Sequence, residues 1–103
     1  MKFSVVITTT ATKEDADKLA RLLLLQRLAA CVQITQIASY YIWNGGVNVD
    51  DEQMLVIKCP TINFPEIEQC IKDNHNYEIP EIIQLPIEAG SADYLNWIAD
   101  VTK

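Results

Sequence analysis

Apolar and polar positions divide the chain into alternating strand-like and helix-like segments. Residues 3–9 are rich in β-branched side chains and predict a strand that is buried on both faces. In residues 13–29, apolar side chains recur at helical spacing, which predicts an amphipathic helix that begins at the capping box Thr12 to Asp15. Four consecutive leucines, residues 22–25, surround the helix axis and predict a helix end that is buried from more than one side.

The longest strand-like segment is residues 31–43, which contains no Gly or Pro. At the rise of a strand it would span roughly 40 Å, about twice the usual length. We therefore expect it to bend at a bulge or to extend beyond its own domain. Asn44-Gly45-Gly46 is a strong turn signal, and residues 52–59 alternate as the returning strand of a hairpin.

The second half of the chain predicts a helix, a strand and a final helix. Asn63 is the candidate N-cap of a helix that ends near Asn74, residues 81–87 form the strand, and Ser91 caps the last helix. The order strand, helix, strand, strand, helix, strand, helix is the split βαβ arrangement with an added C-terminal helix. It places two helices on one face of a four-stranded antiparallel sheet. The other face, which is apolar, would then meet another subunit.

Composition supports one domain with an interface. The 103 residues predict a single domain over 1–103. Half of the residues are hydrophobic, which is the upper edge of the range for a soluble monomer, so a subunit interface would account for the surplus. The net charge of -6, with only 8 Lys and Arg, argues against nucleic acid and against an anionic membrane surface as partners.

Motifs for targeting and catalysis are missing from the pattern. The apolar runs are too short for a signal-peptide core or a membrane span, and the three cysteines form no CxxC pair, so we expect a cytoplasmic protein with reduced thiols. The three glycines form no phosphate-binding loop, no serine lies in a nucleophile elbow, and there is one histidine. We therefore do not expect an enzyme.

Five motifs follow one another along nearly the whole chain. They are Arg27-Leu28-Ala29-Ala30-Cys31-Val32, Ser39-Tyr40-Tyr41-Ile42-Trp43-Asn44-Gly45, Glu52 with Leu55 to Lys58, His75-Asn76-Tyr77-Glu78-Ile79-Pro80-Glu81-Ile82, and Tyr94-Leu95-Asn96-Trp97-Ile98. In this order they resemble the CutA family of divalent-cation-tolerance proteins.

The resemblance implies an α+β, ferredoxin-like protomer in a tight homotrimer, with the sheets around a central three-fold core and the long hairpins pairing across subunits. It also implies involvement in tolerance to divalent cations, with copper binding attributed to some members, no required cofactor and no enzyme activity. The alternative is a function like that of the PII proteins, whose similar trimers bind small effectors in clefts between subunits. That similarity concerns architecture, which does not by itself carry function.

His75 is the lead candidate for a metal ligand, because imidazole suits Cu²⁺. The alternative is that its ring packs at the end of a helix. Members of the family with proposed copper binding carry a Cys near the end of the first strand and paired histidines, whereas Thr8 and Asn74 stand at these places here. Cys31 is a candidate ligand for Cu⁺, and a buried structural thiol is the alternative.

Two further groups of residues have binding chemistry. The segment Asp50-Asp51-Glu52 offers oxygen ligands to a hard cation, and a solvated turn is the alternative. The second group combines aromatic rings with one amine and one carboxylate, and its members are Tyr41, Trp43, Lys58, Tyr77 and Glu81. In the resembled trimer such positions lie near a cleft between subunits, where they would recognise a small charged ligand. Interface packing is the alternative, because Tyr and Trp are enriched there too.

Overall fold

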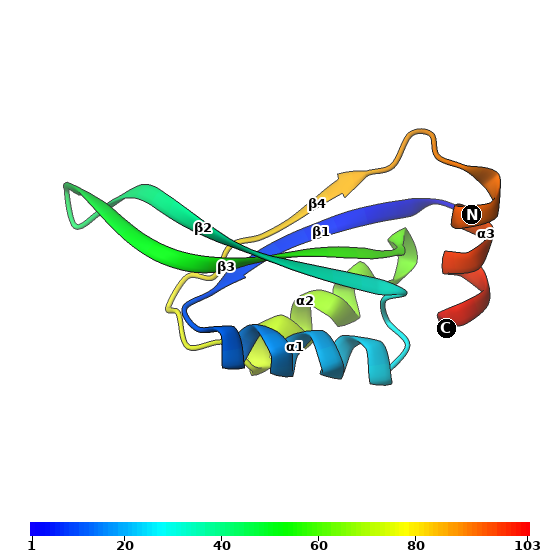
Figure 1. Ribbon diagram of the computed structural model, residues 1–103, viewed down its shortest axis with the longest axis horizontal. Helices are drawn as coiled ribbons and strands as arrows, with labels where there is room; N and C mark the ends of the chain where they lie inside the picture. The colour runs from blue at the N-terminus through cyan, green and yellow to red at the C-terminus, as the bar shows by residue number, and fades with distance from the viewer.

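The computed structural model describes residues 1–103 as a four-stranded antiparallel sheet with two helices on one face (Figure 1). The strands are β1 (Phe3–Thr10), β2 (Cys31–Trp43), β3 (Gly46–Pro60) and β4 (Ile82–Pro86), and the helices are α1 (Lys13–Leu25), the 3₁₀ helix η1 (Thr61–Asn63), α2 (Phe64–Asp73) and α3 (Ala92–Val101). The strand order is β2-β3-β1-β4, which confirms the predicted split βαβ fold. None of the helices is both long and apolar enough to span a bilayer.

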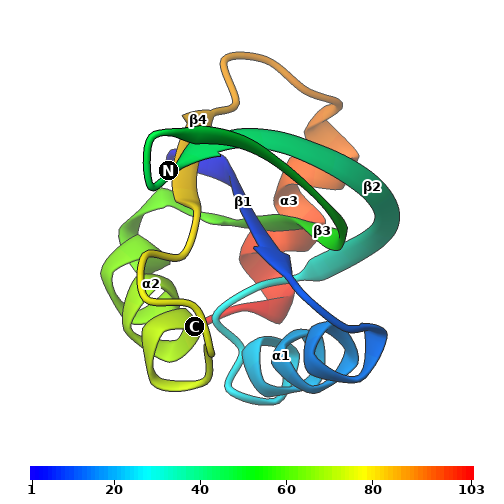
Figure 2. The ribbon, with the colours of Figure 1, turned by 90° about the vertical axis from the view of Figure 1, so that its left-hand side faces the viewer.

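The hydrophobic core lies between the sheet and helices α1 and α2, which run side by side beneath it (Figure 2). Val6 and Ile57 come from the central strands, and Leu19 and Leu23 come from α1. Each of these side chains is at least 99% buried, and full burial of such a side chain contributes about 1.5–3 kcal/mol. This one layer of contacts therefore holds the protomer together, and α3 lies at the end of the sheet far from the hairpin tip (Figure 1).

Helix α1 ends at Leu25 rather than at the predicted residue 29. Arg27 adopts a left-handed conformation with φ 56°, and its N–H donates to the carbonyl of Leu24 at 3.0 Å. The N–H of Leu28 donates to the carbonyl of Leu23 at 3.1 Å, which completes a Schellman motif. The prediction that this helix end is buried from more than one side is wrong for the protomer, because Leu24 and Leu25 are 40% and 81% exposed.

The hairpin of β2 and β3 is the longest feature of the molecule. Asn44 and Gly45 have φ values of 52° and 77°, as a type I′ turn requires, and the ladder runs without interruption from Trp43–Gly46 to the start of β2. Strand β3 begins at Gly46 rather than at residue 52, because the whole of β2 has a pairing partner. The radius of gyration, 14.2 Å, exceeds the value of about 13 Å for a compact chain of this size, since the hairpin projects from the domain (Figure 1).

The sheet face opposite helices α1 and α2 is apolar and is only partly covered within the chain. Because successive side chains of a strand alternate, Val5 and Ile7 point away from the buried Val6. The register places Leu85 beside Val5 and Ile83 beside Ile7 on the same face. Ile83 and Leu85 are 46% and 47% exposed. We call this surface, which Val5, Ile7, Ile83 and Leu85 form, the outer sheet face.

Asn63 has a different role from the predicted cap. It stands at the N-cap position of α2 but makes no capping hydrogen bond. Its side-chain amide instead donates to the carbonyls of Leu28 and Lys103, each at 3.1 Å, and the residue is 6% exposed. Asn63 therefore joins the segment after α1 to the segment after α3. Ser91 stands at the N-cap of α3, also without a side-chain hydrogen bond.

We expect Thr8→Val to raise the free energy of unfolding by about 1 kcal/mol, because the buried Thr8 hydroxyl lacks a hydrogen-bond partner. Valine has the same shape without the polar atom. Thr10→Val is the matched control, because the Thr10 hydroxyl donates to the carbonyl of Thr12 at 2.9 Å and its removal should lower stability. Urea unfolding at one fixed protein concentration measures both variants. A Thr8→Val variant less stable than the parent would contradict the expectation.

Candidate functional site

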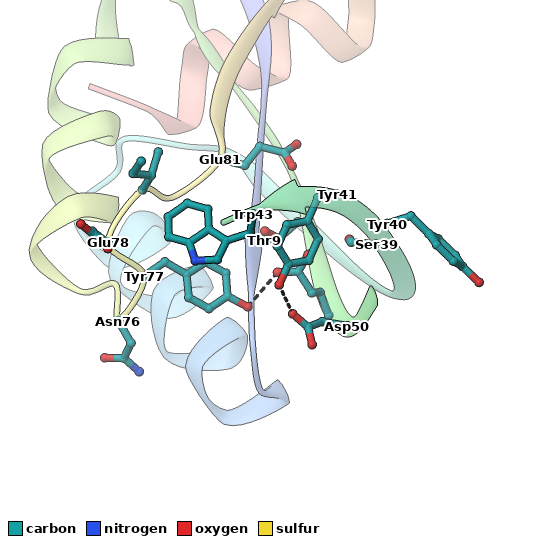
Figure 3. Close-up of a pocket in the computed structure, with 12 residues that line it drawn as sticks. Thr9, Ser39, Tyr40, Tyr41, Trp43, Asp50, Asn76, Tyr77, Glu78 and Glu81 are labelled. Atoms are coloured by element: carbon teal, nitrogen blue, oxygen red, sulfur yellow. Dashed lines mark hydrogen bonds between the residues drawn. The ribbon is translucent and has the colours of Figure 1, made fainter. Parts of the chain in front are cut away.

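A cavity of about 630 Å³ lies between the hairpin and the segment over residues 76–81 (Figure 3). The hairpin supplies aromatic and acidic side chains, β1 supplies its end, and the 76–81 segment forms the opposite wall. The residues that line it are Thr9, Ser39, Tyr40, Tyr41, Trp43, Asp50, Glu52, Asn76, Tyr77, Glu78, Ile79 and Glu81. This volume is within the usual range of about 300–1,000 Å³ for small-molecule sites.

Strand alternation brings the hairpin side chains to the cavity. In the β2–β3 ladder Ser39 lies opposite Asp50 and Ile37 lies opposite Glu52, so both carboxylates are on one face and Asp51 is on the other. Glu52 is only 8% exposed. The acidic segment is thus part of β3, which corrects the interpretation of residues 50–52 as a solvated turn.

Two tyrosines hold these carboxylates by hydrogen bonds (Figure 3). The Tyr77 hydroxyl donates to Glu52 Oε2 at 2.7 Å, and the Tyr41 hydroxyl donates to Asp50 Oδ2. Burial and then the bond to Glu52 raise the pKa of Tyr77, and the bond to Asp50 is the main cause of the raised pKa of Tyr41. The hydroxyls therefore stay protonated at neutral pH, and both rings keep fixed positions in the wall of the cavity.

Four of the five residues predicted to form a cleft do line this one cavity: Tyr41, Trp43, Tyr77 and Glu81. Lys58 does not. It lies on the outer sheet face, beside Val5, where its ammonium group donates to the side chain of Gln33. Sequence reasoning left Asp50 and Glu52 out of the set, although the alternation of β3 could have placed them there. Glu78 was also missed, and it follows Tyr77 in a segment without periodicity.

Both ring nitrogens of His75 are engaged by backbone groups. Nδ1 accepts a hydrogen bond from the Tyr77 N–H at 3.0 Å, so the proton is assigned to Nε2, which donates to the carbonyl of Thr9 at 2.6 Å. The ring also packs 4.7 Å from the ring of Tyr77. A metal at either nitrogen would have to replace one of these bonds. In this conformation His75 fixes Tyr77 in the wall of the cavity.

Cys31 and His75 lie in different regions of the sheet. The half-buried Cys31 begins β2 and is in register, through Lys58, with Val5, whereas His75 contacts Thr9 near the end of β1. No three His, Cys, Asp or Glu side chains come together as a set that could hold a metal ion.

The other cysteines and the two substituted copper-associated positions have structural surroundings. Cys59 and Cys70 are free and buried, and burial raises the pKa of Cys59 to about 11. Thr8 is in the core, and the amide of Asn74 donates to the carbonyl of Cys70 at the end of α2. These side chains therefore pack or cap within the protomer.

The fold and the cavity define the class of the protein: a ferredoxin-like α+β domain with an acidic, aromatic cavity beside a long hairpin. Comparison with known proteins then identifies the family. Residues 4–101 match the family model described as the CutA1 divalent ion tolerance protein. The chain belongs to this family.

Relatives and solved structures agree with that assignment. The divalent-cation tolerance protein CutA of Thermus thermophilus is 40% identical over 99 residues, which are 95% of this chain and 96% of that protein. The CutA1 crystal structure from Oryza sativa has a TM-score of 0.97 at 38% identity and covers 100% of this chain and 95% of that one. The CutA structure from Archaeoglobus fulgidus has a TM-score of 0.96 at 32% identity, over 98% and 99% of the two chains. Of the human protein CutA, 37% identical, this chain spans 56%.

Proposed function

We propose that this chain acts in tolerance to divalent cations as a homotrimer in the cytoplasm. The observation that carries the cation function is the match over residues 4–101, together with a Thermus relative named for divalent-cation tolerance that matches over nearly its whole length. Three free cysteines support a reducing compartment. Binding and assembly, rather than catalysis, would be the work of the protein.

An apolar patch near the hairpin tip supports the trimer. Tyr40 pairs with Val49 and Ile42 pairs with Val47, so all four side chains lie on one face of the hairpin. They are between 54% and 76% exposed. We call these four residues the hairpin patch. Contiguous exposed apolar residues of this kind usually mark an interaction surface.

The hairpin patch and the outer sheet face are two different surfaces, and both need cover. A contact between one surface of a protomer and a different surface of the next is heterologous. Both surfaces of every copy are covered only when such contacts close into a ring. Strands β2 and β4 are also unpaired at the sheet edges, so each offers backbone hydrogen bonds to a neighbour. These features favour a closed ring of identical chains, for which the resemblance indicates three copies.

Cations would meet such a trimer in two ways. Each chain carries a net charge of -6, so the assembly would attract divalent cations diffusely. A tight site needs ligands from more than one protomer, because no set of three potential ligands forms within one chain. Cu²⁺ and Zn²⁺ are the ions to test, because nitrogen, sulfur and oxygen donors all bind them.

Titration of the protein with Cu²⁺ and with Zn²⁺ at physiological ionic strength tests direct binding. We expect saturation at a fixed number of ions per trimer. Because both nitrogens of His75 are bonded to the backbone, His75→Ala should keep that stoichiometry and lower the melting temperature; Asn76→Ala is the neighbouring control. Loss of binding in His75→Ala alone would make the imidazole a ligand. A titration of the parent protein without saturation would contradict direct binding.

The second candidate function is the recognition of a small effector in the cavity, as the architectural similarity to PII trimers suggests. The specific observation in its favour is the 630 Å³ cavity with hydrogen-bonded tyrosines in its wall. Residues that served only to pack the interior would leave no open space of this size. A ligand that binds only the native protein would raise its melting temperature.

A further inference from the structure

The charge of the cavity restricts what it can bind. Four of its lining residues are acidic, Asp50, Glu52, Glu78 and Glu81, and none is Lys, Arg or His. Lys58, the cation that the sequence placed here, bonds to Gln33 on the outer sheet face. A phosphate or carboxylate ligand would therefore meet repulsion and no counter-charge. The lining favours a cation.

Aromatic rings give this cavity a second property that cations recognise. In Figure 3 the rings of Tyr41, Trp43 and Tyr77 gather on the same side of the hairpin, whereas Tyr40 points away from them. Tyr41 and Trp43 are 39% and 41% exposed, so their rings are accessible. A cation that sits over an aromatic face is attracted by the negative face of the ring, by about 0.5–2 kcal/mol.

Among the lining residues, the Glu52 carboxylate gives the strongest indication of what the cavity binds. The residue is 92% buried, and only Oε2 has a partner, the Tyr77 hydroxyl. Oε1 has no hydrogen-bond partner in the chain, and it is not enclosed, because Thr8 Oγ1 is the one fully buried side-chain oxygen or nitrogen that lacks a partner. Removing a carboxylate from water is unfavourable unless it is paired. Because Oε1 remains open, a bound N–H donor or cationic centre could take the place of water beside this largely buried carboxylate.

A bare metal ion does not match this arrangement. Hard divalent cations take six or more oxygen ligands at about 2.0–2.6 Å, whereas no three ligand side chains converge here. The space is also far larger than an ion, and five of the twelve lining residues are hydrophobic. An organic cation has both a charge for the carboxylates and an apolar body for the rings.

We propose that the cavity binds a small organic cation, an aliphatic or quaternary ammonium ion, between the rings of Tyr41, Trp43 and Tyr77, with its charge directed to Glu52. The inference rests on the second candidate function and names its ligand class. Glu78 and Glu81, on the opposite wall, would attract the ligand or receive a second ammonium group of a diamine. The hydroxyls of Tyr41 and Tyr77 already donate to Asp50 and Glu52, so these two tyrosines offer a ligand their ring faces rather than a donor.

The test uses 1,4-diaminobutane and choline as probes, with sodium acetate as an anionic control. Trp97→Phe leaves Trp43 as the single tryptophan, so its fluorescence reports on the cavity. We expect saturable binding of one or both amines and none of acetate. Preference for the diamine would indicate recognition of N–H donors, and preference for choline would indicate recognition by the rings. Calorimetry with the parent protein gives an independent affinity.

Variants of the cavity make the test specific. Glu52→Gln keeps an acceptor for the Tyr77 hydroxyl and removes the charge, so the protein should fold and its dissociation constant should rise about tenfold or more. Glu88→Gln removes the same charge at an exposed position outside the cavity and should change it less than about twofold. Trp43→Leu should also weaken binding, without any change of charge.

Three outcomes would overturn the inference. They are no saturable amine binding at low ionic strength, equal losses in Glu52→Gln and Glu88→Gln, and displacement of the amine by Mg²⁺ or Zn²⁺ at lower concentration. Sedimentation of the same samples separates this failure from that of the assembly. Trimers that bind no amine contradict only the ligand class, whereas monomers contradict the proposed homotrimer.

Discussion

Replacing both Ile83 and Leu85 by aspartate is expected to convert the proposed homotrimer into folded monomers. Both side chains lie on the outer sheet face and are 46% and 47% exposed in the protomer, so the core of the chain does not depend on them. Between subunits, burial of the exposed half of each would contribute roughly half of the about 1.5–3 kcal/mol that full burial gives, and an unpaired carboxylate there would add a further cost. The same contact recurs at every interface of the ring, so each interface loses this stabilisation.

Sedimentation velocity measures this change, and circular dichroism shows that the fold is kept. Leu25→Asp is the matched control, because Leu25 is 81% exposed at the end of α1, on the helix side of the sheet. It should sediment as the parent protein does. A double variant that remains trimeric would show that the outer sheet face is not the interface.

Asn63→Ala should lower the free energy of unfolding by about 2–3 kcal/mol. The side chain is nearly buried and donates to two carbonyls, so its removal leaves the oxygens of Leu28 and Lys103 without these donors. Loss of a partner from a buried acceptor costs about 1–3 kcal/mol. The two segments that it joins, after α1 and after α3, should also become more accessible to hydrogen exchange.

Asn74→Ala provides the comparison for Asn63→Ala. The Asn74 amide makes one hydrogen bond, to the carbonyl of Cys70, at an exposed helix end, so its loss should cost well under 2 kcal/mol. Urea unfolding at equal protein concentration gives both values. Equal losses in the two variants would show that the bridge made by Asn63 adds no stability of its own.

The order of elements could be predicted because each has a local cause. The β-branched residues of β1, the capping Thr12 of α1 and the Asn44-Gly45 turn act within a few residues of themselves. The unusual length of β2 predicted either a bulge or a strand that extends beyond the domain; the ladder has no bulge, and the hairpin projects from the domain (Figure 1). The helices and strands thus arise where sequence pattern and tertiary packing agree.

Element ends depended on contacts that a local pattern does not contain. After α1, Arg27 adopts a left-handed conformation; a glycine at this position would have made the helix end predictable from the sequence. The buried side chains of Leu23 and Leu28 stabilise that turn. The polar start of β3 has weak strand propensity and becomes a strand because β2 lies beside it. In the same way, Asn63 is a residue type that often caps helices, but its side-chain amide donates to two carbonyls of distant segments instead.

The candidate site was half visible in the sequence. Tyr41, Trp43, Tyr77 and Glu81 drew attention as aromatic and charged residues in motifs, and they meet in one cavity. Lys58 shares a face of β3 with Asp50 and Glu52, but it lies six residues after Glu52 along the strand, beside Val5, so it is too far along β3 to line the cavity. The metal sites predicted at His75 and Cys31 are untested, and the backbone bonds of both His75 nitrogens are the reason we expect metal binding to persist in His75→Ala.

The most direct measurement is the mass of the parent protein in solution by sedimentation equilibrium at micromolar concentration. The hairpin patch, which is exposed in one chain, and the outer sheet face, which is partly exposed, are expected to be covered by neighbouring copies. The predicted result is one species with three times the 11.6 kDa mass of the chain, at all concentrations tested. A stable monomer of 11.6 kDa would contradict it, and would leave both apolar surfaces without an explanation.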